Sequence, residues 1–109
     1  MKETGKVVIF VTTSTEEEAH SIAELLLGHK KAACINIVPR IESSFWWQGK
    51  LDSAQESLLI IKTKASVLAE IINLVKDVHT YQVPEIIALP IIGGSEDYLK
   101  WIDGEVKDG

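Results

Sequence analysis

The sequence has only one cysteine, Cys34, so no disulfide can form within the chain. It also lacks an apolar run near the ~20 residues of a membrane-spanning helix, a secretory signal, and any internal repeat. These absences predict a soluble protein of a reducing compartment, and we expect the cytoplasm. If Met1 follows a trimmed transit peptide, we expect an organelle instead.

An excess of basic residues is missing too. The chain has 11 lysines and arginines but 16 aspartates and glutamates, which gives a net charge of −5 and a pI near 5.1. Such a chain lacks the positive field that phosphates or anionic lipids require, so we expect neither nucleic acid nor membrane as a partner. Its 109 residues, 46% of them hydrophobic, predict one domain over residues 1–109.

The first half of the chain reads as a strand, a helix and a second strand. Residues 7–11 form an apolar, β-branched run, and Thr15 with Glu18 is a capping box that opens a helix ending near Gly28. A strand over residues 33–38 is interrupted by Pro39, which predicts an edge position or a β-bulge, and then continues toward residue 45.

The second half completes a long hairpin and adds a helix, a strand and a terminal helix. Gln48 and Gly49 predict a turn that leads into a returning strand ending at residue 63. An apolar stripe over residues 68–78 indicates a helix with Ser66 as its N-cap. A strand over residues 86–89 follows, and residues 93–95 lead into a short helix that carries Tyr98 and Trp101.

This order, βαββαβ with a final helix, predicts an α+β fold in which both main helices cover one face of an antiparallel sheet. Three of the strands are apolar at both alternating positions: residues 7–11, 58–61 and 86–89. A sheet with one wet face alternates apolar and polar residues, so both faces must be covered here. We therefore expect other copies of the chain to cover the second face.

The predicted hairpin tip carries three consecutive aromatic residues, Phe45, Trp46 and Trp47. Neighbouring strand residues point to opposite faces, and each indole presents roughly 150–250 Å² of surface. Leaving both exposed is costly for a small protein. We therefore assign Phe45, Trp46 and Trp47 to an interface between subunits.

Four motifs together resemble one known family over nearly the whole chain. They are residues 32–39 (Ala-Ala-Cys-Ile-Asn-Ile-Val-Pro), 45–50 (Phe-Trp-Trp-Gln-Gly-Lys), 79–85 (His-Thr-Tyr-Gln-Val-Pro-Glu) and 98–101 (Tyr-Leu-Lys-Trp). In this order they resemble the CutA divalent-cation-tolerance proteins. The resemblance implies a ferredoxin-like homotrimer, similar to the PII signalling proteins, with clefts between subunits. It also implies a role in tolerance of copper and other divalent cations.

The metal ligands that the chain offers are few. Copper prefers imidazole and thiolate donors, which makes His79 and Cys34 the candidates. The alternatives are a small buried side chain for Cys34 and a helix-capping role for His79. Some bacterial members of the family carry a cysteine and a second histidine where this chain has Val11 and Val78. Copper or another divalent cation should therefore bind weakly, if at all.

Other candidate donors have simpler interpretations. His20 and His29 are nine residues apart, on opposite faces of their helix, and each is interpreted as a surface histidine. Glu16, Glu17 and Glu18 lie in a first helical turn, where acidic residues stabilise the helix dipole.

The segment 79–85 places an imidazole, a phenol and a carboxylate in one short turn before a strand. One interpretation is a rigid corner, in which Glu85 pairs with a cation such as Lys62. The other is a ligand-binding site in the cleft between subunits, formed by Tyr81 and Glu85, with Trp47 as an apolar wall and Lys62 as an anion partner. Both remain open at this point.

No nucleophile, paired carboxylates or metal-ligand spacing stands out, so we expect a non-enzyme. Gly93, Gly94 and Ser95 are interpreted as a turn with an N-cap. Three functions remain: a metal-responsive trimer, a PII-like scaffold that binds a small anionic ligand, and a trimer that presents its helices to a protein partner.

Overall fold

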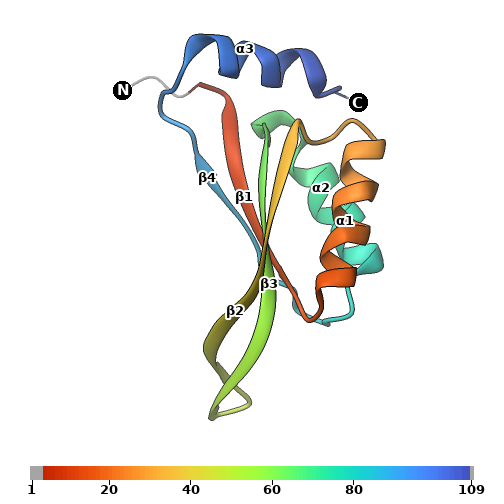
Figure 1. The fold of residues 1–109 in the computed structure, drawn as a ribbon, viewed down its shortest axis with the longest axis vertical. Helices are drawn as coiled ribbons and strands as arrows, with labels where there is room; N and C mark the ends of the chain where they lie inside the picture. The colour runs from red at the N-terminus through yellow and green to blue at the C-terminus, as the bar shows by residue number, and fades with distance from the viewer. Residues whose placement is uncertain (1–3, 109) are drawn as a thin grey trace.

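The computed structural model describes residues 4–108, so Met1 and the next two residues, part of the segment considered for a leader, lie outside it. Residues 4–108 contain four strands, three α-helices and one short 3-10 helix, and Figure 1 shows how they are arranged. In chain order they are β1 (Lys6–Thr13), α1 (Glu16–Gly28), β2 (Cys34–Trp47), β3 (Lys50–Lys64), η1 (Ala65–Val67), α2 (Leu68–Val78), β4 (Ile86–Pro90) and α3 (Glu96–Glu105).

The strands form one antiparallel sheet in the order β2-β3-β1-β4. Helices α1 and α2 lie together on one face of it, and α3 lies across one end (Figure 1). This arrangement confirms the predicted α+β, ferredoxin-like βαββαβ fold with a terminal helix.

The core lies between the sheet and the two helices. On the inner strands every second side chain is fully buried against the helices, including Ile9, Val11, Leu59 and Ile61. The helices contribute their apolar stripes, which are Ala19, Ile22, Ala23 and Leu26 from α1 and Ile71 and Val75 from α2. Each large side chain buried here stabilises the fold by about 1.5–3 kcal/mol.

The opposite sheet face, which we call the open face, carries similar side chains that are not fully buried. Val8, Phe10 and Ile60 remain partly exposed, and Ile87 is 52% exposed. The predicted apolar character of both faces is therefore confirmed, and no segment within residues 4–108 seals the open face.

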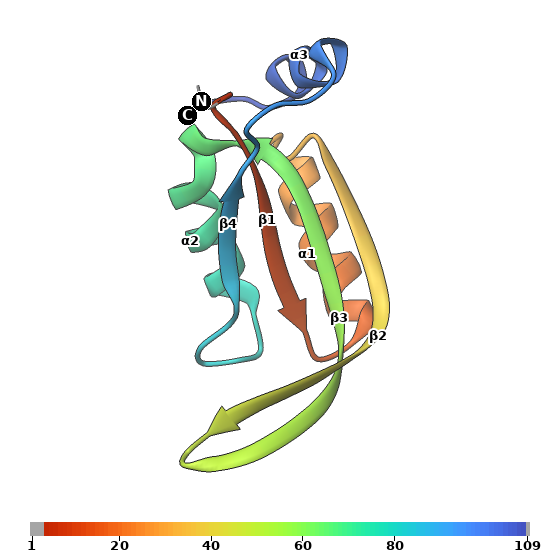
Figure 2. The same cartoon turned by 90° about the vertical axis from the view of Figure 1, so that its left-hand side faces the viewer.

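The hairpin of β2 and β3 extends beyond the rest of the sheet. Residues 57–64 of β3 pair with β1, whereas residues 50–56 pair only with β2. The result is a two-stranded ribbon that projects from the body and bends to one side (Figure 2). A two-stranded ribbon is only marginally stable alone, so its apolar tip needs further contacts.

The ribbon closes in a two-residue turn, as predicted. Gln48 and Gly49 have φ values of 50° and 78°, the left-handed pair of a type I′ hairpin turn. Beside this turn Trp46 is 73% exposed and Trp47 48% exposed. Within one chain, both indoles therefore keep much of their surface in water.

The interruption at Pro39 is a bulge on an edge strand, as predicted. The register of β2 against β3 shifts between Val38 and Ile41, and Arg40 has a φ of 56°. The shift increases the local twist where the ribbon leaves the sheet.

The predicted N-cap of α2 is wrong. Ser66 lies inside η1, its hydroxyl donates to Asp108, and α2 begins after Val67 without a side-chain cap. Ser95 does occupy the N-cap position of α3, although its side chain makes no capping hydrogen bond. Of the helices in residues 4–108, none is both long enough and apolar enough to cross a membrane.

Candidate functional site

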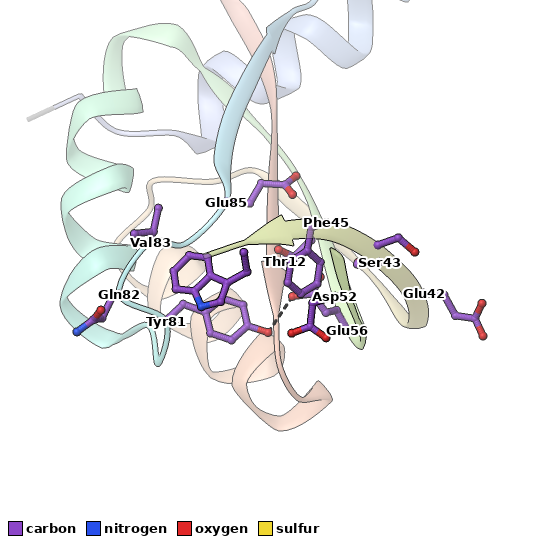
Figure 3. A pocket seen from close by; sticks show the side chains of 12 residues that line it. Thr12, Glu42, Ser43, Phe45, Asp52, Glu56, Tyr81, Gln82, Val83 and Glu85 are labelled. Atoms are coloured by element: carbon purple, nitrogen blue, oxygen red, sulfur yellow. Dashed lines mark hydrogen bonds between the residues drawn. The ribbon is translucent and has the colours of Figure 1, made fainter. Parts of the chain in front are cut away.

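The candidate site is a cleft of about 800 Å³ between the ribbon and the segment 79–85, which we call the corner loop. In Figure 3, Tyr81 of the corner loop and Glu56 of the ribbon point toward each other, whereas Glu42 and Gln82 point away at the two ends. The cleft is lined by Thr12 from β1, by Glu42, Ser43, Ser44, Phe45, Trp47, Asp52 and Glu56 from the ribbon, and by Tyr81, Gln82, Val83 and Glu85 from the corner loop.

His79 begins the corner loop as the residue that caps α2, and its side chain is fully buried. Its Nδ1 accepts the Tyr81 N–H at 3.0 Å, so the proton of the neutral ring is on Nε2, which donates to the Thr12 carbonyl at 2.7 Å. Both ring nitrogens thus have partners within the chain, and the imidazole fixes the loop against β1.

Glu18 holds the same loop from the side of α1. Its carboxylate accepts hydrogen bonds from the Thr80 N–H at 2.9 Å and from the Ser14 N–H at 3.2 Å. Partial burial opposes ionisation, but these hydrogen bonds outweigh it and lower the pKa of Glu18. The Nδ1 atom of His79 lies 3.7 Å from the same carboxylate. Glu18 therefore does more than complement a helix dipole.

Glu56 contacts the corner loop from the ribbon. The Tyr81 hydroxyl donates to the Glu56 carboxylate at 2.8 Å, as the dashed line in Figure 3 marks. Glu56 is only 8% exposed, whereas its neighbours toward the ribbon tip are exposed. Burial first, and then the hydrogen bond and charge of Glu56, raise the pKa of Tyr81 to about 12.

Glu85 is at the upper edge of the cleft, directly before β4. Partial burial, followed by the charge of Glu56, raises the pKa of its carboxyl. The suggested ion pair between Glu85 and Lys62 is not formed. Lys62 lies farther along β3, opposite Cys34, and its ammonium donates to the side chain of Asn36. Within this chain the cleft therefore includes Trp47, Tyr81 and Glu85 but not Lys62.

The two predicted metal ligands do not meet. Cys34, the first residue of β2, pairs with Lys62 of β3, which in turn pairs with Val8 of β1. His79 instead bonds to Thr12, four residues further along β1. Four strand residues span about 13 Å. Within residues 4–108 no three histidine, cysteine or acidic side chains are grouped as a metal site. His20 and His29 are exposed, as predicted.

Cys34 instead lies beside α3. Partial burial, and then the neighbouring Cys34 thiol, raise the pKa of the Tyr98 phenol. The Tyr98 and Trp101 rings pack on each other with centroids 5.4 Å apart, and both remain partly exposed. The two rings therefore contact each other, as their spacing on the helix suggests, and a structural role for them stays a prediction.

Sequence reasoning missed the carboxylates of the ribbon: Glu42, Asp52 and Glu56. Of the three, only Glu56 could have been found from the sequence, because it points to the same open face as the apolar Leu58 and Ile60. A carboxylate on such a row needs a partner, which proves to be Tyr81. Its identity depends on how the corner loop folds back, which no local pattern contains.

Comparison with known proteins places the chain among relatives of similar sequence. A model of the CutA1 divalent ion tolerance protein family matches residues 7–105. Protein CutA 1, chloroplastic, of Oryza sativa is 45% identical over 94% of this chain, which spans 58% of the rice protein. The chain likewise spans 62% of Protein CutA, chloroplastic, of Arabidopsis thaliana. The divalent-cation tolerance protein CutA of Archaeoglobus fulgidus is 46% identical over 91% of this chain and 96% of its own length.

Solved structures agree with this grouping. CutA1 from Oryza sativa superimposes with a TM-score of 0.92 at 44% identity, covering 95% of both chains. The periplasmic divalent cation tolerance protein CutA of Archaeoglobus fulgidus superimposes with a TM-score of 0.91 at 44% identity, covering 94% of this chain and 99% of its own. On the family match, the shared sequence and the shared fold, the chain belongs to the CutA1 divalent ion tolerance protein family.

Proposed function

We propose that this protein acts in divalent-cation tolerance as a homotrimer that binds copper or another divalent cation only weakly. The observation that carries the proposal is the family match over residues 7–105, together with the names of its relatives. The role is one of binding rather than catalysis. It is performed in a reducing compartment, the cytoplasm or an organelle, where Cys34 remains a thiol.

Two features of the single chain support a trimer. The open face keeps apolar side chains partly exposed, and the ribbon carries Phe45, Trp46 and Trp47 away from the body. Covering this surface with other copies stabilises each chain by about 25 cal/mol for every Å² removed from water. The ribbon is the natural element to reach a neighbour, because among the described residues its two strands form a ladder only with each other.

The weakness of cation binding follows from the donors. His79 uses both ring nitrogens within the chain, and Cys34 is remote from it. A cation that takes His79 must first displace the Tyr81 N–H or the Thr12 carbonyl. It gains no second soft ligand nearby in return.

Native mass spectrometry of the full chain, titrated with copper(II) and then with EDTA, tests both parts. We expect a trimer with little saturable copper, and the same adducts in His79→Ala as in His20→Ala, an exposed histidine of α1. One tight copper ion per chain that is lost only in His79→Ala would contradict weak binding. A monomer would contradict the proposed assembly.

A second candidate function is a PII-like scaffold with a small-molecule site in the cleft, and the cleft itself favours it. Tyr81, Glu85 and Trp47 line a space large enough for a metabolite. Such a scaffold is stabilised by its small-molecule ligand, and chelators do not change its stability. A metal-responsive protein is instead destabilised when a chelator removes the metal. A third function, presentation of the exposed helix faces to a protein partner, has no observation that favours it here.

A further inference from the structure

We infer that the cleft binds a positively charged organic ligand, a small molecule with an amine or guanidinium group, between aromatic walls and the carboxylates of Glu56 and Glu85. The inference rests on the second candidate function, a small-molecule site in this cleft. It differs from the small anionic ligand expected from the sequence for the cleft between subunits.

The charge of the lining is of one sign. Within residues 4–108 of one chain, Glu42, Asp52, Glu56 and Glu85 all border the cleft, and no lysine or arginine does. Lys62, the cation expected to receive an anion, lies farther along β3 and is bonded to Asn36. Among residues 4–108, none of these four carboxylates forms an ion pair. An anionic ligand would meet uncompensated repulsion here, whereas a cation would relieve it.

Glu56 is the carboxylate of the cleft whose position is fixed most firmly. It is more than nine-tenths buried and is held by the Tyr81 hydroxyl, so its position is set before any ligand arrives. Partial burial first, and then the charge of Glu56, raise the pKa of Glu85, so the two carboxyl groups interact across the cleft. A donor group between them would form charge-assisted hydrogen bonds, which are stronger than neutral ones.

The other walls favour an organic cation over a bare metal ion. Phe45, Trp47 and Tyr81 contribute aromatic rings to the lining, and such rings attract ammonium and guanidinium groups at their faces. The volume of about 800 Å³ suits a molecule rather than an ion. The carboxylates are not grouped as metal ligands in the described part of the chain.

The test uses three probes of one shape and different charge: benzylamine, benzyl alcohol and benzoate. Each is titrated into the ¹⁵N-labelled full chain in EDTA, and the backbone amide shifts of residues 42–56 and 79–85 are followed. We expect benzylamine to bind about tenfold more tightly than benzyl alcohol and benzoate not to bind, because one charge-assisted pair contributes about this much. Added salt should weaken benzylamine only.

Glu56→Gln is the decisive variant, because glutamine still accepts the Tyr81 hydroxyl while the charge is lost. We expect about tenfold weaker benzylamine binding in it, and wild-type binding in Glu24→Gln, an exposed carboxylate of α1 remote from the cleft. Circular dichroism spectra and trimer mass should match wild type in both.

Three results would overturn the inference in distinguishable ways. If benzoate or benzyl alcohol binds at least as tightly as benzylamine, the cleft is a ligand site but not a cation site. If Glu56→Gln binds benzylamine as wild type does, the carboxylate plays no part and the inference is wrong. If no probe shifts the amides of residues 42–56 and 79–85, the second candidate function fails together with the inference.

Discussion

The two faces of the sheet carry nearly the same kinds of side chain but have different surroundings. On the face toward α1 and α2, Ile9, Val11 and Ile61 are fully buried. On the open face, the alternating neighbours Val8, Phe10 and Ile60 are equally apolar yet only partly covered. Composition alone thus does not tell which face is sealed within the chain and which is left partly exposed.

The same contrast applies to two tryptophans of similar exposure. Trp47 on the ribbon is 48% exposed and Trp101 on α3 is 43% exposed. Trp101 stacks on Tyr98 of its own helix, whereas Trp47 lies at the end of a ribbon that pairs with nothing beyond its own strands. We therefore expect an interface role for Trp47 alone.

The largest expected effect comes from Trp47→Ala. If other copies bury this indole, its loss removes about 3–5 kcal/mol from the stability of the assembly, as for a buried large side chain. Sedimentation velocity and thermal unfolding measure it, with Trp101→Ala as the matched control, which should lose about 0.5–1.5 kcal/mol of ring stacking. A Trp47→Ala protein that stays trimeric and as heat-stable as wild type would refute the interface role.

The next comparison sets Ile61→Ala against Ile60→Ala, neighbours on β3 that face opposite sides. Ile61→Ala should lower the free energy of unfolding by about 2–4 kcal/mol at every protein concentration, because it leaves a cavity under the helices. Ile60→Ala should act mainly through assembly, so its cost should depend on protein concentration. Urea unfolding at two concentrations separates the two, and equal, concentration-independent losses would contradict the contrast.

A smaller effect is expected from Tyr81→Phe, which tests the contact between the corner loop and the ribbon. Losing the donor leaves the buried Glu56 carboxylate short of a partner and should cost about 1–3 kcal/mol. Because the pKa of Tyr81 is raised to about 12, the stability it contributes is complete below pH ~10 and is lost as the pH rises through the folded value. Tyrosinate absorbance, recorded in Tyr98→Phe to isolate Tyr81, checks this. A midpoint near pH 10 would count against the contact.

The smallest expected effect is that of Glu18→Gln, which tests the contact of the same loop with α1. The pKa of Glu18 is lowered in the fold, so its contribution is complete above the unfolded pKa near 4.3 and is lost as the pH falls through the folded value. We expect a loss of about 1 kcal/mol at pH 7 that shrinks toward zero in acid.

Urea unfolding of wild type and Glu18→Gln between pH 7 and pH 3 measures this convergence. Glu17→Gln, at an exposed position in the same helical turn, is the control and should change little at any pH. A Glu18→Gln deficit that stays constant with pH would show that the carboxylate charge is not the cause.

Much of the fold was predictable because its signals are local. Thr15 caps α1 as predicted, because the Glu18 N–H donates to its hydroxyl at 3.1 Å, although the Glu18 carboxylate accepts from Ser14 and Thr80 rather than completing a capping box. Gln48 and Gly49 specify the ribbon turn, and Pro39 marks the bulge region. Each of these depends on a few neighbouring residues. The failed prediction, Ser66 as an N-cap, involves a hydroxyl that bonds to distant Asp108 instead.

The cleft was predictable only in part. Trp47, Tyr81 and Glu85 do line it, because turns between elements bring short polar motifs to the surface. Lys62 does not line it within one chain, since its place follows from the pairing register of β3 with β2 and β1. A register is set by a whole row of pairs and cannot be read from one lysine.

The sequence by itself determined the order of strands and helices, the apolar character of both sheet faces and the exposed aromatic tip, because hydrophobic period and turn chemistry act within a few residues. Only the tertiary structure decided that His79 bonds to Thr12, 67 residues away, and that Tyr81 meets Glu56 across the cleft. Such pairs form when chain closure and strand register bring distant polar groups into a buried space, where an unpaired group would be costly.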